Sequence, residues 1–379
     1  MKLLILTAFY PVPNGTHERM FVHIRNKYYL ENGADVTVLN FDTENDYEID
    51  GIRVISENTY KNSSEDYDIA VCHSANVRNH YGFLKKYEKR FNHLVFFFHG
   101  HEVLFLNKDY PKAYDYMKSA KFYRRIMQNF YDRFKMSIWK RYYKELAYKS
   151  DFVFVSNWLL KHFKENLKMT ESDLKNNYHI INNSVGSFFE EADYDSKCEK
   201  KYDFISIRSN MDGSKYCIDS VVALANRYPS EKFLIIGKGI FFEHNKKPEN
   251  VTWISKTISH EEMKNYLNQS KCGILLTRQD TQGVMTCEFA AYGIPTITSD
   301  IEVCHEFFKD RKNVALISND VDKVDLMKVK EDLLKGLPYE KDKNYFAVNT
   351  IKKEMDLYKN ILNNSNRSYG NWSKYEKNC

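Results

Sequence analysis

One segment of the chain, residues 272–299, constrains the fold more than any other. It begins with the apolar run CGILL, which predicts a buried strand, and continues with the polar loop TRQDTQ. Gly283 then opens a predicted helix of about ten residues, which Gly293 ends and Pro295 prevents from resuming. The letters TIT that follow predict the next parallel strand. Strand, loop, helix and strand in this order form the repeating unit of an α/β sheet.

Two carboxylates in this segment suit the binding of a sugar nucleotide. Asp280 lies in the loop, and Glu288 lies about a turn and a half into the helix. Loop and helix N-terminus face the crevice at the carboxyl ends of the strands, where open α/β sheets bind ligands. The N–H groups of Gly283, Val284 and Met285 suit an anionic diphosphate, and Glu288 can accept hydrogen bonds from a vicinal diol such as a ribose.

The same segment resembles the E-x7-E signature of retaining GT-B glycosyltransferases of family 4, the glycosyl transferases of group 1. That signature is written E-x-F-G-x4-E, followed by A-x-G-x-P. Asp280 replaces the first glutamate and Gln282 replaces the aromatic residue, whereas Gly283, Glu288 and the later G-x-P match. The resemblance implies the α/β GT-B fold: two Rossmann-like domains that face an interdomain cleft, with a C-terminal helix that crosses back to the N-terminal domain.

Strand-like and helix-like segments alternate in two series along the chain. Between the series lies the charged stretch EEADYDSKCEKK, residues 190–201, which we predict to be the linker. Residues 1–189 are predicted to form the acceptor-binding Rossmann-like domain, completed by about 345–379. Residues 202–344 are predicted to form the nucleotide-sugar-binding Rossmann-like domain. No G-x-G-x-x-G follows the first strand, which argues against a dinucleotide enzyme.

Family members carry cations and glycines at further positions that this chain matches in part. Arg208 follows a predicted strand and Lys215 lies in the polar loop after it; the resemblance implies that both hold the donor diphosphate. Cations that stabilise a departing diphosphate give transfer without a metal a chemical basis. Gly15, after the first strand, matches the family's glycine pair only in part. Gly237 and Gly239 match the G-x-G that lines the base pocket.

One histidine completes the predicted site. His99 ends the hydrophobic strand VFFF, and the resemblance implies that it contacts the donor sugar. Together with Asp280 and Glu288 it forms the predicted catalytic set, and Glu102 is a candidate for positioning the acceptor. The D-x-D triplets at 66–68 and 193–195 lie before a strand and in the linker, so we expect no metal site and no cofactor.

Residues 108–149 are basic and aromatic, with twelve lysines and arginines against four acids. Apolar residues recur every fourth position from Phe122 to Leu146. An α-helix turns about 400° in four residues, so this repeat drifts around the helix, and we expect two helices with a break near 133–137. The segment is either a pair of core-packing helices with a solvated basic face or an in-plane anchor to an anionic membrane.

The sequence therefore predicts a cytoplasmic hexosyltransferase, peripheral on the inner face of the plasma membrane. It would move a sugar from a UDP- or GDP-linked donor, with retention, to a hydroxyl of a lipid-linked glycan in bacterial capsule or cell-surface polysaccharide synthesis. Two alternatives remain open: a sugar-nucleotide-binding protein without transferase activity, and a GT-B sugar-nucleotide epimerase. A net charge of +5 is too small to imply nucleic acid. Seven scattered cysteines without C-x-x-C predict free thiols.

Overall fold

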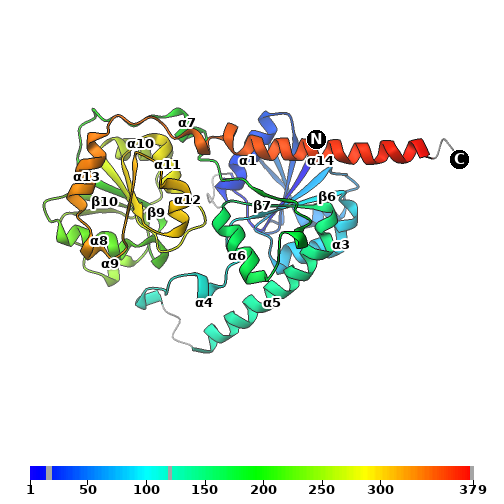
Figure 1. Cartoon of the computed structure of the whole chain (residues 1–379), viewed down its shortest axis with the longest axis horizontal. Coiled ribbons are helices and arrows are strands. Elements are labelled where there is room, and N and C mark those ends of the chain that lie inside the picture. The colour runs from blue at the N-terminus through cyan, green and yellow to red at the C-terminus, as the bar shows by residue number, and fades with distance from the viewer. Residues whose placement is uncertain (14–18, 118–121, 376–379) are drawn as a thin grey trace. The chain divides into compact units, whose positions relative to one another are not determined.

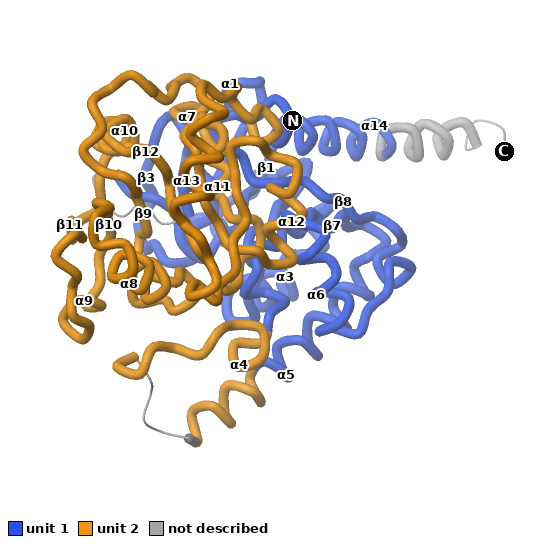
Figure 2. The backbone as a smooth tube through the Cα atoms, turned by 60° about the vertical axis from the view of Figure 1, so that its left-hand side comes forward, with its two compact units in different colours: residues 1–104, 132–184, 347–379 blue, residues 105–131, 185–346 orange. Residues whose placement is uncertain are grey.

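The chain folds into two compact units, which Figure 2 shows in separate colours. A computed structural model describes residues 1–13, 19–117 and 122–375. Unit 1 consists of residues 1–104, 132–184 and the chain from 347 onward, and unit 2 consists of residues 105–131 and 185–346. Each unit carries its own sheet and its own hydrophobic core. None of the helices in the described ranges combines the length and apolar character needed to span a membrane.

The sheet of unit 1 has eight strands, all parallel to their neighbours except β3, which is antiparallel to β4. In order across the sheet the strands are β3 (Tyr47–Ile49), β4 (Ile52–Ile55), β2 (Asp35–Asn40), β1 (Lys2–Thr7), β5 (Ile69–His73), β6 (His93–Phe98), β7 (Ser150–Phe154) and β8 (Tyr178–Ile180). The chain moves from β1 to one side and later returns to the other side as β5. The switch point of this doubly wound sheet therefore lies between β1 and β5.

The C-terminal helix α14 packs in unit 1 beside α1 (Figure 1). Its carboxylate Glu354 is buried and accepts hydrogen bonds from Arg25 Nε at 3.0 Å and from the hydroxyl of Tyr29. This confirms the predicted return of the C-terminal helix to the N-terminal domain. The α-helices of unit 1 are α1 (Met20–Glu31), α2 (Glu57–Lys61), α3 (Gly82–Tyr87), α6 (Asn157–Leu167) and α14 (Ile351–Tyr375).

The sheet of unit 2 has six parallel strands, and its switch point lies between β9 and β12. In order across the sheet the strands are β11 (Val251–Ile254), β10 (Phe233–Lys238), β9 (Tyr202–Asn210), β12 (Ser270–Leu275), β13 (Thr296–Ser299) and β14 (Val314–Ile317). Its α-helices are α4 (Leu106–Asp109), α7 (Ser187–Glu191), α8 (Ile218–Arg227), α9 (Phe241–His244), α10 (His260–Asn268), α11 (Val284–Tyr292), α12 (Glu302–Phe308) and α13 (Leu326–Lys335).

The segment 272–299 forms β12, α11 and β13 as predicted. Gly283 and Gly293 bound α11 with φ angles of +76° and +89°, which side chains rarely adopt. The N–H of Gly293 donates to the carbonyls of Phe289 and Ala290, which closes the helix. Helix and strand pack closely here, because a Cβ on Gly273 would lie 2.4 Å from the ring of Phe289.

The compact units differ from the predicted domain boundaries in two places. The predicted linker 190–201 groups with unit 2, where the Tyr194 N–H donates to the carbonyl of Tyr292 at 2.9 Å. Residues 105–131, predicted as part of the N-terminal domain, also group with unit 2. Contacts over long sequence separations decide both placements, and the local sequence carries no sign of them.

Helix α5 (Phe122–Leu146) runs unbroken in Figure 1, so the predicted break near 133–137 is wrong. Residues 122–131 of α5 group with unit 2 and the remainder with unit 1. The four-residue repeat does drift around the helix, as its spacing requires. It starts on the solvent side, with Phe130 and Phe134 exposed, and ends in the core, with Tyr142 and Leu146 buried. One straight helix therefore accommodates the whole repeat, because its two halves have different surroundings.

Candidate functional site

Two predicted site residues lie on either side of the switch point of the unit 2 sheet. Arg208 lies near the carboxyl end of β9, and Asp280 lies in the loop after β12. The Arg208 guanidinium donates to the carbonyl of Leu276, at the start of that loop, at 2.7 Å. The N–H of Thr277 then donates to the Ser299 hydroxyl of β13 at 2.8 Å. The loop is thereby tied to both neighbouring strands at the edge where open α/β sheets bind ligands.

The surroundings of Arg208 suit an anion. The side chain is buried, and its Nε has no hydrogen-bond acceptor within the described part of the chain. Burial lowers the pKa of the guanidinium, and the Asp280 carboxylate counteracts this effect. A buried cation with an unsatisfied donor is costly, and a bound phosphate oxygen would satisfy it.

Lys215 joins Arg208 through an aromatic ring that the sequence prediction had not included. The ring of Tyr216 lies 5.0 Å from the Arg208 guanidinium carbon and 4.7 Å from the Lys215 ammonium nitrogen. Cation–π contacts of this kind attract both cations to one ring. Both predicted diphosphate ligands therefore contact the same ring.

A second unpredicted residue, Arg278, ties the Asp280 loop to the segment that carries Lys215. Its guanidinium donates to both oxygens of Asp219, at 2.9 and 2.6 Å, and its N–H donates to the carbonyl of Lys215 at 2.8 Å. Bidentate arginine–carboxylate pairs fix geometry more strongly than single hydrogen bonds. Nothing in the sequence marks this pair, because its two members belong to separate elements.

The loop before α11 presents backbone donors. The N–H groups of Gly283, Val284 and Met285 have no protein acceptor among the described residues, as expected for the first turn of a helix. The Asp280 carboxylate accepts from the Thr281 N–H at 2.7 Å, which orients its side chain. Gln282 is buried and points towards the sulfur of Cys287, so it fills the interior rather than the crevice.

Glu288 lies on α11, half-buried and without a hydrogen-bond partner in the parts of the chain that the structure covers. Loss of hydration raises the pKa of its carboxyl to about 8. Protein groups leave this carboxylate unsatisfied, so a ligand that donates hydrogen bonds would stabilise it. A ribose diol is such a ligand.

The two glycines after β10 allow a close backbone approach. A Cβ on Gly237 would lie 2.2 Å from the carbonyl oxygen of Arg208, and a Cβ on Gly239 would lie 2.8 Å from the carboxylate of Asp212. Asp212 also accepts from the N–H of Ile240 at 3.0 Å. The predicted G-x-G therefore packs directly against the strand and loop that carry the cations.

A strap of two tyrosines from residues 105–117 supports this loop from outside. The Tyr116 hydroxyl donates to Asp212 at 2.9 Å, and its ring stacks on His244 with centroids 4.4 Å apart. The Tyr114 hydroxyl donates to Asp219 at 2.9 Å. Each tyrosine thus contacts a carboxylate that orders the site. Sequence reasoning missed both, since they lie far from the site along the chain.

His99 lies in unit 1, at the carboxyl end of β6. Its Nε2 is 3.1 Å from Nδ1 of His73, so one ring donates and the other accepts. Burial lowers the pKa of His99 well below its usual value, which keeps the ring neutral. Glu102 is buried and accepts hydrogen bonds from the N–H groups of His99 and Gly100, so it holds the loop; its predicted role in positioning an acceptor stays a prediction. Gly15 lies outside the described residues.

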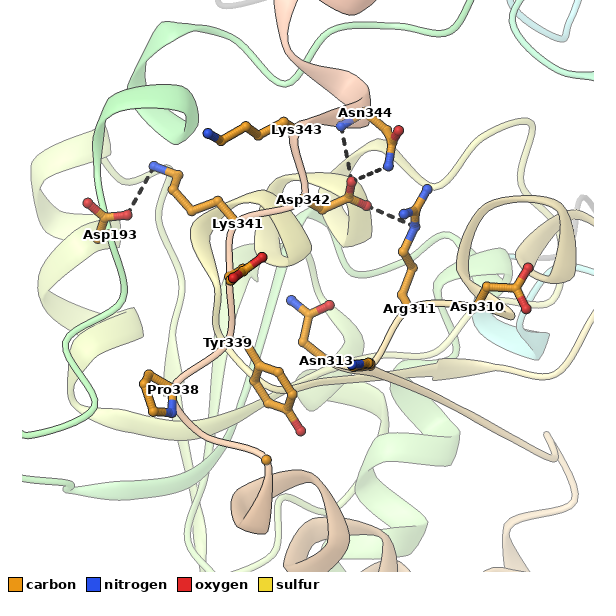
Figure 3. A pocket seen from close by; sticks show the side chains of 13 residues that line it. Asp193, Asp310, Arg311, Asn313, Pro338, Tyr339, Lys341, Asp342, Lys343 and Asn344 are labelled. Carbon is orange, nitrogen blue, oxygen red and sulfur yellow. Dashed lines mark hydrogen bonds and ion pairs between the residues drawn. The ribbon is translucent and has the colours of Figure 1, made fainter.

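A cavity of 1290 Å³ lies at the opposite edge of the unit 2 sheet, beside Asn313 at the start of β14 (Figure 3). Ion pairs cross it: Lys341 with Asp193 at 3.3 Å, and Arg311 with Asp342 at 3.0 Å. None of the predicted site residues lines this cavity. Four of its charged side chains form these two pairs, whereas Arg208 Nε and Glu288 at the carboxyl edge have no partner among the described residues.

Comparison with known proteins agrees with this fold. Residues 204–334 match the family model described as glycosyl transferases group 1. A comparison with curated protein sequences gives no match.

Solved structures of similar fold cover almost the whole chain. Sucrose-phosphate synthase from Thermosynechococcus elongatus is 10% identical over 95% of this chain and 99% of its own, with a TM-score of 0.64. A glycosyltransferase from Rickettsia africae is 14% identical over 95% and 98%, with a TM-score of 0.64. WaaG, a glycosyltransferase involved in lipopolysaccharide biosynthesis, is 13% identical over 88% and 90%, with a TM-score of 0.55. The chain thus has the GT-B fold, and its residues 204–334 are similar to the glycosyl transferases of group 1.

Proposed function

We propose that the protein is a retaining hexosyltransferase of family 4 that uses a UDP- or GDP-linked sugar. The observation that carries this proposal is the set of unsatisfied groups at the carboxyl edge of unit 2. Three groups on neighbouring elements are unsatisfied within the described chain: Nε of the buried Arg208, the amides at the start of α11 and the half-buried carboxylate of Glu288, whose pKa is raised. A nucleotide sugar supplies a partner for each group. Its phosphate oxygens can accept hydrogen bonds from the arginine and the amides, and its ribose diol can donate hydrogen bonds to the carboxylate.

Each group has a role in the proposed reaction. Arg208, Lys215 and the amides of Gly283, Val284 and Met285 bind the diphosphate. Glu288 accepts hydrogen bonds from the ribose hydroxyls, and the loop of Gly237 and Gly239 lines the pocket for the base. Asp280 binds the donor sugar, and neutral His99 of unit 1 contacts that sugar as a hydrogen-bonding group rather than as a cation.

In the proposed reaction the product keeps the anomeric configuration of the donor, because the proton of the acceptor hydroxyl passes to the leaving group. The bond between the anomeric carbon and the phosphate oxygen breaks, and the acceptor hydroxyl oxygen bonds to the same carbon on the same face. The departing phosphate oxygen takes the hydroxyl proton, so no protein base is required. This route depends on stabilisation of the leaving diphosphate, which the proposed cations and amides provide.

The acceptor and the cellular setting belong to the same proposal. We assign residues 1–189 with 345–379 to acceptor binding, residues 202–344 to donor binding and 190–201 to the linker between them. The acceptor is a lipid-linked glycan of a bacterial capsule or cell-surface polysaccharide, modified by a cytoplasmic enzyme at the inner membrane face. The likeness to WaaG, a glycosyltransferase involved in lipopolysaccharide biosynthesis, supports a surface polysaccharide.

A screen of nucleotide sugars by thermal unfolding tests the proposal. Binding at a hundred times Kd adds about 2.7 kcal/mol to the free energy of unfolding, so one donor should raise Tm well above the others. The Glu288→Gln variant should lose most of that rise. Stabilisation by none of the UDP- or GDP-sugars would contradict the proposal. Donor conversion without acceptor would indicate the epimerase, and binding without any turnover would indicate the silent binding protein.

A further inference from the structure

The first half of α5 exposes a continuous apolar face, which we name the α5 stripe. Its members are Ile126, Met127, Phe130, Tyr131 and Phe134, with exposed fractions of 41%, 64%, 62%, 49% and 58%. Their separations of one, three and four residues place all five side chains on one side of the helix. A soluble protein rarely exposes so many large apolar side chains side by side without a partner.

The α5 stripe is not the face by which the helix packs into unit 1. That face carries Met136, Trp139 and Tyr143, which are buried. At about 100° per residue, these positions lie roughly opposite the stripe around the helix axis. Core packing therefore explains the second half of α5 but leaves the stripe unexplained.

Positive charge accompanies the stripe. Arg124 and Arg133 are exposed and flank the stripe, each about 90° from its centre around the helix axis, and Arg141 continues the line of the stripe, where it pairs with Glu145 at 2.9 Å. The acid within this stretch, Asp132, is buried on the core side and forms an ion pair with Lys135 at 3.5 Å. The exposed surface of this first half of α5 is thus apolar in the middle and cationic at its flanks.

We infer that the α5 stripe inserts into the interface of an anionic lipid bilayer, with the helix axis in the plane of the membrane. Apolar side chains enter the boundary of head groups and acyl chains, and arginines pair with anionic head groups, as in other in-plane amphipathic helices. The same charges disfavour a second copy, because a symmetric dimer would place arginine beside arginine. This inference deepens the proposed membrane location, on which it rests, by naming the residues that insert.

Insertion of the stripe and attraction by charge alone predict different effects of salt on vesicle binding. A purely electrostatic attachment is lost when salt shortens the Debye length from about 8 Å to about 3 Å near 1 M. An inserted stripe keeps its apolar contribution at that salt concentration. We therefore expect salt to weaken binding of the full chain to anionic vesicles without abolishing it.

The experiment is co-sedimentation of the full chain with vesicles of phosphatidylglycerol and phosphatidylcholine, and with vesicles of phosphatidylcholine alone. The double variant Phe130→Ser and Phe134→Ser should bind anionic vesicles about a hundredfold more weakly, at about tenfold for each buried aromatic ring. The control Val348→Ser removes an apolar side chain that is 55% exposed elsewhere and should bind like the parent. A second variant, Phe130→Leu with Phe134→Leu, should keep most of the binding.

Further readouts separate the possible results. Both stripe variants should unfold at the parent's Tm, because the replaced side chains are exposed, and should transfer sugar to a soluble acceptor at the parent's rate. Vesicle binding that is equal for the parent and the serine variant would overturn the inference, as would absence of binding to anionic vesicles. Self-association without lipid that the serine variant loses would also overturn it, in favour of a second copy. A parent that binds vesicles but transfers no sugar would contradict the proposed function alone.

Discussion

Glu288 is a glutamate whose pKa the surroundings raise to about 8, because the protein removes water from its carboxyl without supplying a partner. Replacing it by glutamine should weaken donor binding about tenfold to hundredfold, since hydrogen bonds to a charged group contribute roughly 1.5–3 kcal/mol. Calorimetric titration with the donor measures this loss. Glu306→Gln, an exposed glutamate on α12, serves as the control and should bind like the parent. Equal affinity for parent and Glu288→Gln would remove Glu288 from the ribose site.

The raised pKa of Glu288 also predicts how pH acts on binding and on stability. Ribose hydroxyls favour the ionised carboxylate, so donor binding at pH 7 should release a proton, and affinity should rise with pH until about 8. In the free protein the folded pKa lies above the unfolded value of 4.5, so Glu288 makes the fold less stable as pH rises between 4.5 and about 8. Glu288→Gln should therefore raise Tm more at pH 8 than at pH 5.

Titration calorimetry in buffers of different ionisation enthalpy counts the released proton. The parent should release protons at pH 7, and Glu288→Gln should release markedly fewer. A binding enthalpy that does not depend on the buffer would show that Glu288 keeps its protonation state when donor binds.

Sequence reasoning at the residue scale found the charged groups but not what holds them. Asp280, Glu288, Arg208 and Lys215 were predicted from their positions after strands and at a helix start, and in the structure all four belong to unit 2, on β9, on α11 and in the segments that follow β9 and β12. The ring of Tyr216 between the two cations was not predicted, because stacking depends on the path of the loop rather than on spacing. Transfer by these residues stays a prediction until it is measured.

At the scale of elements, the tyrosine strap before α5 connects residues 105–117 to the donor loop. Tyr116→Phe should raise the KM for the donor several-fold and change kcat less, because it removes the hydrogen bond that helps Asp212 hold the G-x-G loop. The expected loss in the free energy of unfolding is about 1 kcal/mol, the usual contribution of one hydrogen bond. Tyr148→Phe, on an exposed tyrosine, is the matched control. An unchanged KM would show that the contact between Tyr116 and Asp212 does not affect donor binding.

Elements were predictable where periodicity and turn residues agreed. Strand, loop and helix in 272–299 follow from an apolar run bounded by Gly283 and Gly293, and the structure confirms them. The break predicted in α5 failed for a different reason. The argument assumed that one face of a helix packs against one core, whereas the repeat in α5 begins in solvent and ends in unit 1. These surroundings are set by tertiary packing, which the spacing of residues along the chain does not reveal.

At the scale of the whole molecule, the proposed reaction works without a metal ion. The diphosphate would be held by Arg208, Lys215 and backbone amides, so activity should be unchanged after treatment with EDTA. Complete loss, restored by Mg²⁺ or Mn²⁺, would contradict this assignment.

The fold of the whole chain was predictable from the two series of strands and from the motif in 272–299, and the structural comparisons agree with the GT-B fold. The boundaries of the compact units along the chain were harder to predict. Residues 105–131 and 185–201 join unit 2 through hydrogen bonds and stacked rings formed over long sequence separations. Composition identified the charged stretch 190–201 but not which unit it would pack against.

The anomeric configuration of the first product tests the central claim most directly. Once a donor is identified by thermal unfolding, the fresh product is examined by NMR, and the coupling constant of its anomeric proton is compared with that of the donor. The account predicts a glycoside with the configuration of the donor, because the leaving phosphate oxygen, held by Arg208, Lys215 and the amides at Gly283, takes the acceptor's proton. A product of inverted configuration would contradict the retaining reaction and would require a protein base that the proposed site does not supply.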